Sequence, residues 1–93
     1  MSVVFRLPGY LSELTGGRSR VVLDASPATV GDALAVLGDA HPAVRDRVLT
    51  EQGHVRTHVN VFVGRESIRY TGGLATPLRE GAELFVLPAV SGG

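Results

Sequence analysis

The residues best placed to do chemistry lie at the end of the chain, which has the sequence Pro88-Ala89-Val90-Ser91-Gly92-Gly93. Glycine has no Cβ and accepts backbone angles closed to other residues, so a diglycine end suits a narrow passage. We expect residues 89–93 to form a flexible tail, with Val90, Ser91 and Gly92 threading into a partner's active site. The reacting group would be the Gly93 carboxylate. Adenylation would give it a good leaving group, and a sulfur nucleophile could then displace AMP to leave a thiocarboxylate.

Other chemically capable side chains form weaker patterns. His54 and His58 have a spacing that suits a metal ion on a helix, but they lie in a polar, glycine-containing stretch that is a poor helix. We interpret them, together with His41, as solvent-facing. Gly72-Gly73 lacks the Gly-Lys-Ser/Thr pattern of a phosphate loop and predicts a tight turn. Ser91 has no base arranged by any motif. The sequence therefore predicts no catalytic residue and no metal site.

The composition excludes several classes of site and partner. The 93 residues, enough for one domain, include no cysteine, which rules out thiol nucleophiles, disulfides and zinc–thiolate sites. The formal net charge of +0 argues against a nucleic-acid partner. No apolar run is long enough for a membrane span, and residues 1–6 predict a strand rather than a signal peptide. We expect a cytoplasmic protein that is monomeric when free and does not contact a membrane.

The basic residues are unusual because all nine are arginine. A bias of composition toward arginine is the simpler interpretation. The functional interpretation is that a protein with an activated carboxyl end benefits from the absence of side-chain amines and thiols, which can attack acyl centres, whereas arginine stays protonated.

Four segments predict strands. Residues 3–7 and 20–23 are rich in strand formers and are separated by proline and glycine turn signals, which predicts a loose hairpin. Residues 59–63 alternate, with valines expected to face the core and Asn60 and Phe62 pointing the other way. Residues 83–87 form the last strand, and residues 67–70 could form a short return strand. Residues 10–14 are ambiguous between a helical turn and a loop.

One main helix is expected after Thr29, which suits an N-cap. The apolar stripe of this helix is Val30, Ala33, Leu34 and Leu37. Pro42 then begins a short second helix with Val44 and Val48 on one face. A helix with a single apolar stripe needs a sheet to cover it. We therefore predict an α+β fold of the β-grasp type over residues 1–88, with a mixed sheet of about four to five strands and parallel first and last strands.

Three apolar residues point away from the predicted core. They are Phe62, opposite the valine face of its strand, and Phe85 and Leu87, opposite Leu84 and Val86. A second buried layer, or ordinary scatter of apolar residues on the surface, would explain them. The alternative is an apolar docking patch for an activating enzyme.

The sequence resembles the MoaD/ThiS family of ubiquitin-like sulfur carriers along essentially its whole length. The matching residues are Glu80-Gly81-Ala82-Glu83-Leu84, a turn into an apolar strand in which Ala82 replaces the usual acid, and the diglycine end. Val59-Asn60-Val61 and the segment from Arg69 to Leu78, Arg69-Tyr70-Thr71-Gly72-Gly73-Leu74-Ala75-Thr76-Pro77-Leu78, are most similar to the CysO-type carriers of cysteine biosynthesis.

This resemblance implies a carrier and not an enzyme. It implies activation of Gly93 by an E1-like adenylating enzyme of the MoeB/ThiF type that uses ATP and magnesium. The implied acceptor is an activated serine derivative on a PLP-dependent cysteine synthase, with cysteine later released from the carrier by a metalloprotease. The alternatives are the small subunit of molybdopterin synthase, a carrier shared among sulfur pathways, a protein modifier joined to lysines, or a plain β-grasp binding module.

Overall fold

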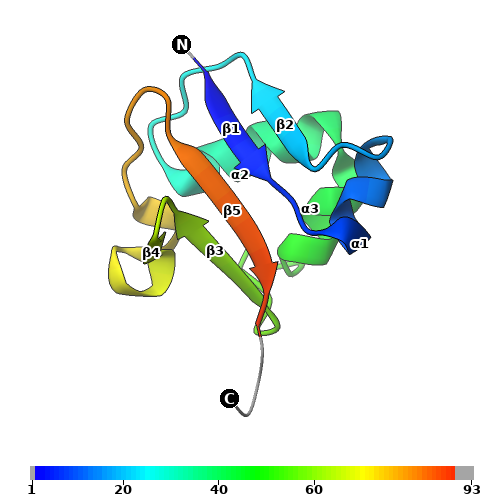
Figure 1. Ribbon diagram of the computed structural model, residues 1–93. Coiled ribbons are helices and arrows are strands. Elements are labelled where there is room, and N and C mark those ends of the chain that lie inside the picture. The colour runs from blue at the N-terminus through cyan, green and yellow to red at the C-terminus, as the bar shows by residue number, and fades with distance from the viewer. Residues whose placement is uncertain (1, 90–93) are drawn as a thin grey trace.

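The computed structural model describes residues 2–89. Within this range the chain forms a five-stranded mixed sheet in the order β2-β1-β5-β3-β4, and helices α2 and α3 lie against one face of it (Figure 1). The strands are β1 (Val3–Arg6), β2 (Arg20–Leu23), β3 (Val59–Val63), β4 (Glu66–Ser67) and β5 (Glu83–Pro88).

The central strand of the sheet is β5, which pairs with a strand on each side. β1 and β5 run parallel, with Phe5 opposite Leu84, whereas β3 and β5 are antiparallel, with Val61 opposite Val86. β1 and β2 form the predicted antiparallel hairpin. The pairing of β1 with β5 confirms the predicted parallel pairing of the first and last strands. The chain between them crosses over through the helices, which makes a parallel pairing possible. The α+β, β-grasp prediction is therefore correct.

The predicted helices are also present, as α2 (Val30–Ala40) and α3 (Pro42–Val48). The Thr29 hydroxyl accepts a hydrogen bond from the N–H of Asp32 at 3.2 Å, as expected of an N-cap. The whole apolar stripe of α2 is buried against the sheet. The core joins that stripe to the inward side chains of the strands, among which Phe5, Val59, Val61, Leu84 and Val86 are almost fully buried. Between residues 2 and 89, no helix is long and apolar enough to cross a bilayer.

Two local predictions need correction or completion. The predicted return strand is wrong beyond Ser67, because β4 ends there and Ile68–Tyr70 forms a 3-10 helix. The Ser67 hydroxyl accepts a hydrogen bond from the N–H of Arg69 at 3.3 Å, which caps this turn and directs Ile68 into the core. The ambiguous segment after β1 is helical: α1 (Gly9–Ser12) continues into a 3-10 helix, Glu13–Thr15.

Candidate functional site

The end of β5 is where the chain leaves the described fold. β5 ends at Pro88, and the N–H of Ala89 donates a hydrogen bond to the carbonyl of His58 at 2.8 Å. The chain is therefore held to the sheet through Ala89, the first residue of the predicted tail. The residues predicted to carry the chemistry, Val90, Ser91, Gly92 and Gly93, lie outside the described residues.

The outer face of the sheet, which the helices do not cover, displays the three apolar residues singled out from the sequence. Phe62 and Phe85 are direct cross-strand neighbours, and Leu87 lies two residues further along β5. We call these three residues the outer-face patch. In Figure 1 this face is turned toward the viewer and α2 and α3 lie behind the sheet. The first alternative, a second buried layer, is therefore wrong for the described part of the chain.

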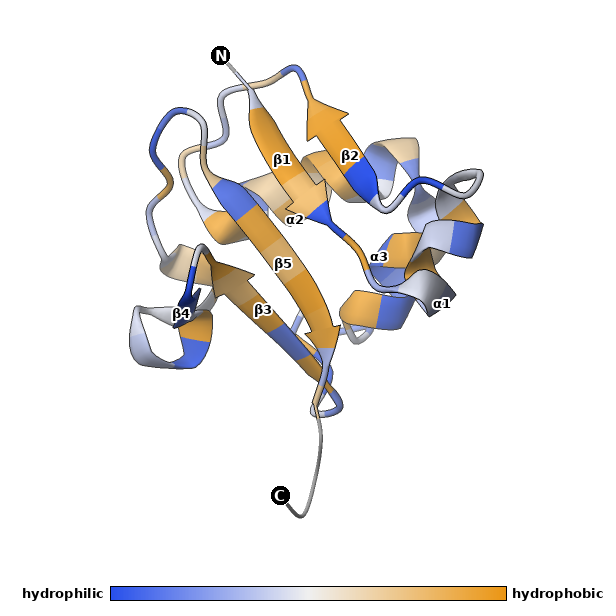
Figure 2. Ribbon diagram, viewed as in Figure 1, coloured by the Kyte–Doolittle hydropathy of each residue, from blue (hydrophilic) through white to orange (hydrophobic). Residues whose placement is uncertain are grey.

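The exposure of the outer-face patch increases toward the end of β5. Phe62 and Phe85 are half-buried, whereas Leu87 is 43% exposed. Figure 2 shows that the central strands are apolar along most of their length. The charged part of this face lies at the other end of β5, where Arg6 and Glu83 form an ion pair at 2.8 Å. The exposed apolar end of the patch is thus the end nearest to the exit of the chain.

The histidines are not assembled into a site. His41 lies between α2 and α3, and His54 and His58 lie in the loop before β3 rather than on a helix. The geometric reason for suspecting a metal site at His54 and His58 is therefore removed. Among the residues that the structure describes, no group of three or more His, Cys, Asp or Glu side chains could hold a metal ion.

The Gly72-Gly73 pair forms the tight turn that was predicted. Both glycines have positive φ, at 119° and 61°. The buried hydroxyl of Thr76 donates a hydrogen bond to the Gly73 carbonyl at 2.6 Å, and the Thr76 carbonyl accepts from the N–H of Val30 at 3.0 Å. The segment therefore fastens the chain to the start of α2.

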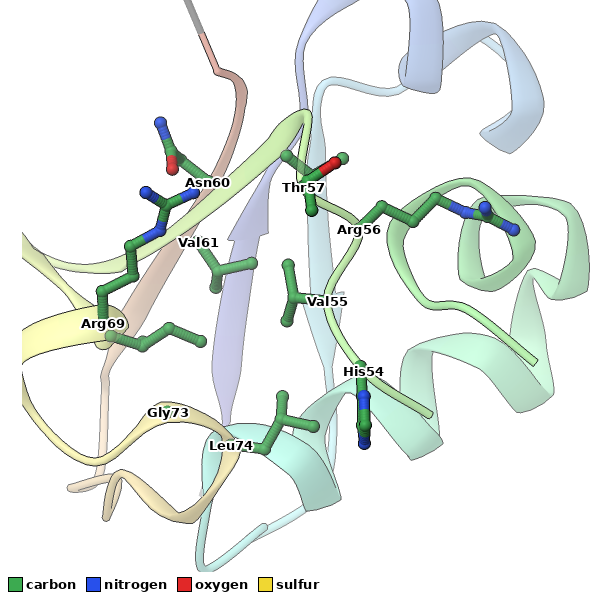
Figure 3. Close-up of a pocket in the computed structure, with 11 residues that line it drawn as sticks. His54, Val55, Arg56, Thr57, Asn60, Val61, Arg69, Gly73 and Leu74 are labelled. Atoms are coloured by element: carbon green, nitrogen blue, oxygen red, sulfur yellow. The ribbon is translucent and has the colours of Figure 1, made fainter. Parts of the chain in front are cut away.

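A groove at the edge of β3 was missed from the sequence. Its apolar lining includes Val55, Val61, Ile68 and Leu74, which come from separate segments of the chain (Figure 3). Val55 and Leu74 lie in segments that the sequence predicts only as loop or turn. Hydropathy alone therefore gave little signal for the groove.

Comparison with known proteins agrees with the fold. The model of the ThiS family matches residues 5–93. The chain belongs to the ThiS family. This match and a full-length similarity to CysO together confirm the resemblance to sulfur carriers of the MoaD/ThiS type and, within that type, to CysO.

Three relatives show how far the similarity extends. The sulfur carrier protein CysO of Mycobacterium tuberculosis is 34% identical over 95 residues, covering 100% of both chains. Its crystal structure has a TM-score of 0.85 at 32% identity and covers 95% of this chain and 99% of that one. Small archaeal modifier protein 1 of Haloferax volcanii is 42% identical over 90 residues, which is 96% of this chain and 98% of that protein. A chain of the BexX/CysO complex of Amycolatopsis orientalis has a TM-score of 0.85 at 33% identity. The match covers 98% of this chain and 99% of that one.

Proposed function

We propose that this protein is a sulfur carrier whose working group is the carboxylate of Gly93. The observation that supports this most directly is that the family match runs through residue 93 and so includes both Gly92 and Gly93. Full-length similarity to a protein named as a sulfur carrier points the same way. The protein itself is then a substrate of partner enzymes rather than a catalyst.

The proposed chemistry has two steps, both performed by an E1-like enzyme of the MoeB/ThiF type. A carboxylate oxygen of Gly93 attacks the α-phosphorus of magnesium-bound ATP, giving an acyl adenylate and releasing pyrophosphate. A sulfur nucleophile then attacks the acyl carbon, and AMP leaves with the bonding electrons. Hydrosulfide as the nucleophile gives the thiocarboxylate directly. A persulfide donor gives an acyl disulfide, and a thiol then attacks the donor sulfur of the S–S bond, which leaves the thiocarboxylate on Gly93 and a disulfide on the donor. The thiocarboxylate presents a nucleophilic sulfur for transfer.

The fold contributes recognition. The outer-face patch is the proposed docking surface for the activating enzyme, because it is apolar, uncovered within the described residues and most exposed beside the end of β5. A partner that covers Leu87 would have the start of the tail within its interface. Val90, Ser91 and Gly92 would then lead into its active site.

The proposed sulfur acceptor belongs to cysteine biosynthesis. The support is similarity to CysO over the whole chain. The acceptor would be an activated serine derivative on a PLP-dependent enzyme, followed by release of cysteine by a metalloprotease. A carrier shared among sulfur pathways and a molybdopterin synthase subunit are the alternatives within this class. The BexX/CysO complex of Amycolatopsis orientalis is a case of a CysO protein assembled with another protein.

Intact-mass measurement tests the proposal. The protein is incubated with ATP, magnesium, a sulfur donor and its adenylating enzyme, and the mass should rise by the difference between one sulfur and one oxygen. A variant lacking Gly92 and Gly93 should show no such rise, whereas Arg65→Glu, on the exposed turn between β3 and β4, leaves the tail intact and should be charged normally. The proposal would be contradicted if the truncated variant gained sulfur. It would also be contradicted if the intact protein gained no sulfur from an enzyme that charges a known carrier.

A second function, as a protein modifier, is favoured by the 42% identity to small archaeal modifier protein 1. In that case the activated Gly93 would be joined to lysine amines of other proteins. Isopeptide-linked adducts that require ATP and Gly93 would support this function, and their absence from cells in which the thiocarboxylate accumulates would argue against it.

A further inference from the structure

The edge of the sheet formed by β2 has no strand beside it. β2 pairs with β1 on one side only, and it lies at one end of the strand order (Figure 1). An unpaired strand edge is a template for another extended chain, and proteins that do not use such an edge usually blunt it with charge, proline or a bulge. The register of β2 with β1 is continuous, residues 20–23 contain no proline, and their only charged residue is Arg20, at the start of the strand. The rest of this edge therefore carries none of these devices.

The backbone groups on this edge belong to exposed residues. The N–H of Leu7 donates to the Ser19 carbonyl at 2.7 Å, which marks Leu7 and Ser19 as a hydrogen-bonded pair of the antiparallel ladder. Because such pairs alternate, the odd-numbered residues of β2 point their backbone groups toward β1, whereas Arg20 and Val22 point theirs away from the sheet. Both residues are exposed, Val22 at 48%, and their N–H and carbonyl groups have no backbone partner on this side among residues 2–89. They are therefore available to an added strand.

Two charges of opposite sign flank Val22. Arg20 and Asp24 each lie two residues from it, and both are exposed. Within the part of the chain that the structure describes, neither forms an ion pair. The cross-strand neighbour of Arg20 is Arg6, whose charge is already matched by Glu83 at 2.8 Å. Arg20 therefore has a like charge beside it, and an acidic side chain on an added strand would be a favourable neighbour.

This pattern is complementary to itself. When two copies of the strand pair antiparallel around a twofold axis at Val22, Arg20 of each copy lies opposite Asp24 of the other, and the two Val22 side chains lie side by side. The even-numbered residues are then opposed, which agrees with the outward direction of their backbone groups. On the helix-covered side, Val21 of one copy lies opposite Leu23 of the other, and each of these residues is only 6% exposed. A strand without this order of charges would lack the match at one end or at both.

We propose that the β2 edge pairs antiparallel with the β2 edge of a second copy of this chain, which joins the two sheets into one. A twofold axis perpendicular to the sheet keeps both outer faces on the same side. The outer-face patch lies on β3 and β5, away from β2, so it stays open in the dimer. A paired strand edge is far smaller than a standard interface of about 1,600 Å², so the dissociation constant should be on the order of 0.1–1 mM. The protein is then monomeric at micromolar concentration.

Self-association of the purified protein tests this inference, with no enzyme or ATP present. Sedimentation equilibrium between about 0.02 and 2 mM should show a monomer that becomes a dimer toward the top of this range. Over the same range, the amide NMR signals of residues 20–24 should shift and hydrogen exchange at Val22 should slow. A protein that stays monomeric at about 2 mM, or shifts that centre on Phe85 and Leu87, would overturn the inference. Either result leaves the proposed carrier function untouched, because no sulfur chemistry is involved.

Charge exchange tests the pairing itself. Arg20→Glu and Asp24→Arg should each weaken self-association about fourfold or more, because each places like charges opposite one another at two symmetry-related positions. An equimolar mixture of the two variants should restore the dimer, because one copy then carries acids at both positions and the other carries bases. Arg65→Glu makes the same charge change on the exposed turn between β3 and β4 and should not alter association. The pairing is wrong if the mixture stays monomeric, or if Arg65→Glu weakens association as much as Arg20→Glu does.

Discussion

Leu87→Asp is the substitution that best separates docking from folding. Leu87 is 43% exposed, so a partner can still bury a little under half of the side chain. Full burial of a leucine is worth about 1.5–3 kcal/mol, so closing the remaining surface contributes about 0.6–1.3 kcal/mol. An aspartate there loses this term and also places an unpaired carboxylate in the interface, which costs about 1–3 kcal/mol more. The sum, about 2–4 kcal/mol, predicts a fall in kcat/KM for adenylation of about 30-fold or more.

The assay is ATP–pyrophosphate exchange by the adenylating enzyme at carrier concentrations below KM. Val22→Asp is the matched control, because Val22 is on the same face and is 48% exposed, but it lies on β2 at the opposite edge. We expect near wild-type exchange with Val22→Asp, and a loss with Phe62→Asp that parallels the loss with Leu87→Asp. Denaturant unfolding of each variant shows whether the fold is kept. Unchanged exchange with both Leu87→Asp and Phe62→Asp, in folded protein, would refute the docking role of the outer-face patch.

Three substitutions and one control, Gly9→Ala, test the local structure by urea unfolding. Thr29→Ala removes the N-cap of α2 and should lower the free energy of unfolding by about 1 kcal/mol; an unchanged midpoint would contradict the cap. Gly81→Ala should lower the free energy of unfolding by about 1–2 kcal/mol because Gly81 has a φ of +78°; no atom obstructs the new methyl group. Gly9→Ala is the control, since Gly9 has similar free space and no positive φ, and it should lower the free energy of unfolding by less. Thr76→Val should cost about 1–3 kcal/mol, because the buried hydroxyl donates to the Gly73 carbonyl; a neutral result would show that this bond contributes little.

Much of the fold could be predicted because the strong signals are periodic. The alternation in residues 59–63 and the stripe of α2 each bury one set of side chains, and burial decides which face turns inward. The extent of the return strand could not be predicted in this way. The pattern from Ser67 to Tyr70 suits a strand, but the Ser67 hydroxyl bonds to a nearby N–H and starts a 3-10 turn instead.

The candidate site could be predicted only in part. The outer-face patch follows from alternation, because a residue next to a core-facing one must point outward, and the register then brings Phe62 beside Phe85. The groove beside β3 depends on how the Gly73 turn packs against a distant loop, and no local pattern encodes that packing. Arg69 illustrates the same point, since its sequence neighbours do not reveal that it lines the rim of an apolar groove.

The position of β5 connects the fold to the proposed chemistry. A carrier whose end group is drawn into another protein experiences a pull on the strand that precedes the tail. An edge strand such as β2 could peel away under such a pull, one backbone bond at a time. β5 is paired on both sides, and its inward residues Leu84 and Val86 are 0% exposed, so displacing it would open both neighbouring ladders and the core together. A tail anchored in the central strand can thus be gripped, charged and discharged while the recognition surfaces on the sheet keep their shape.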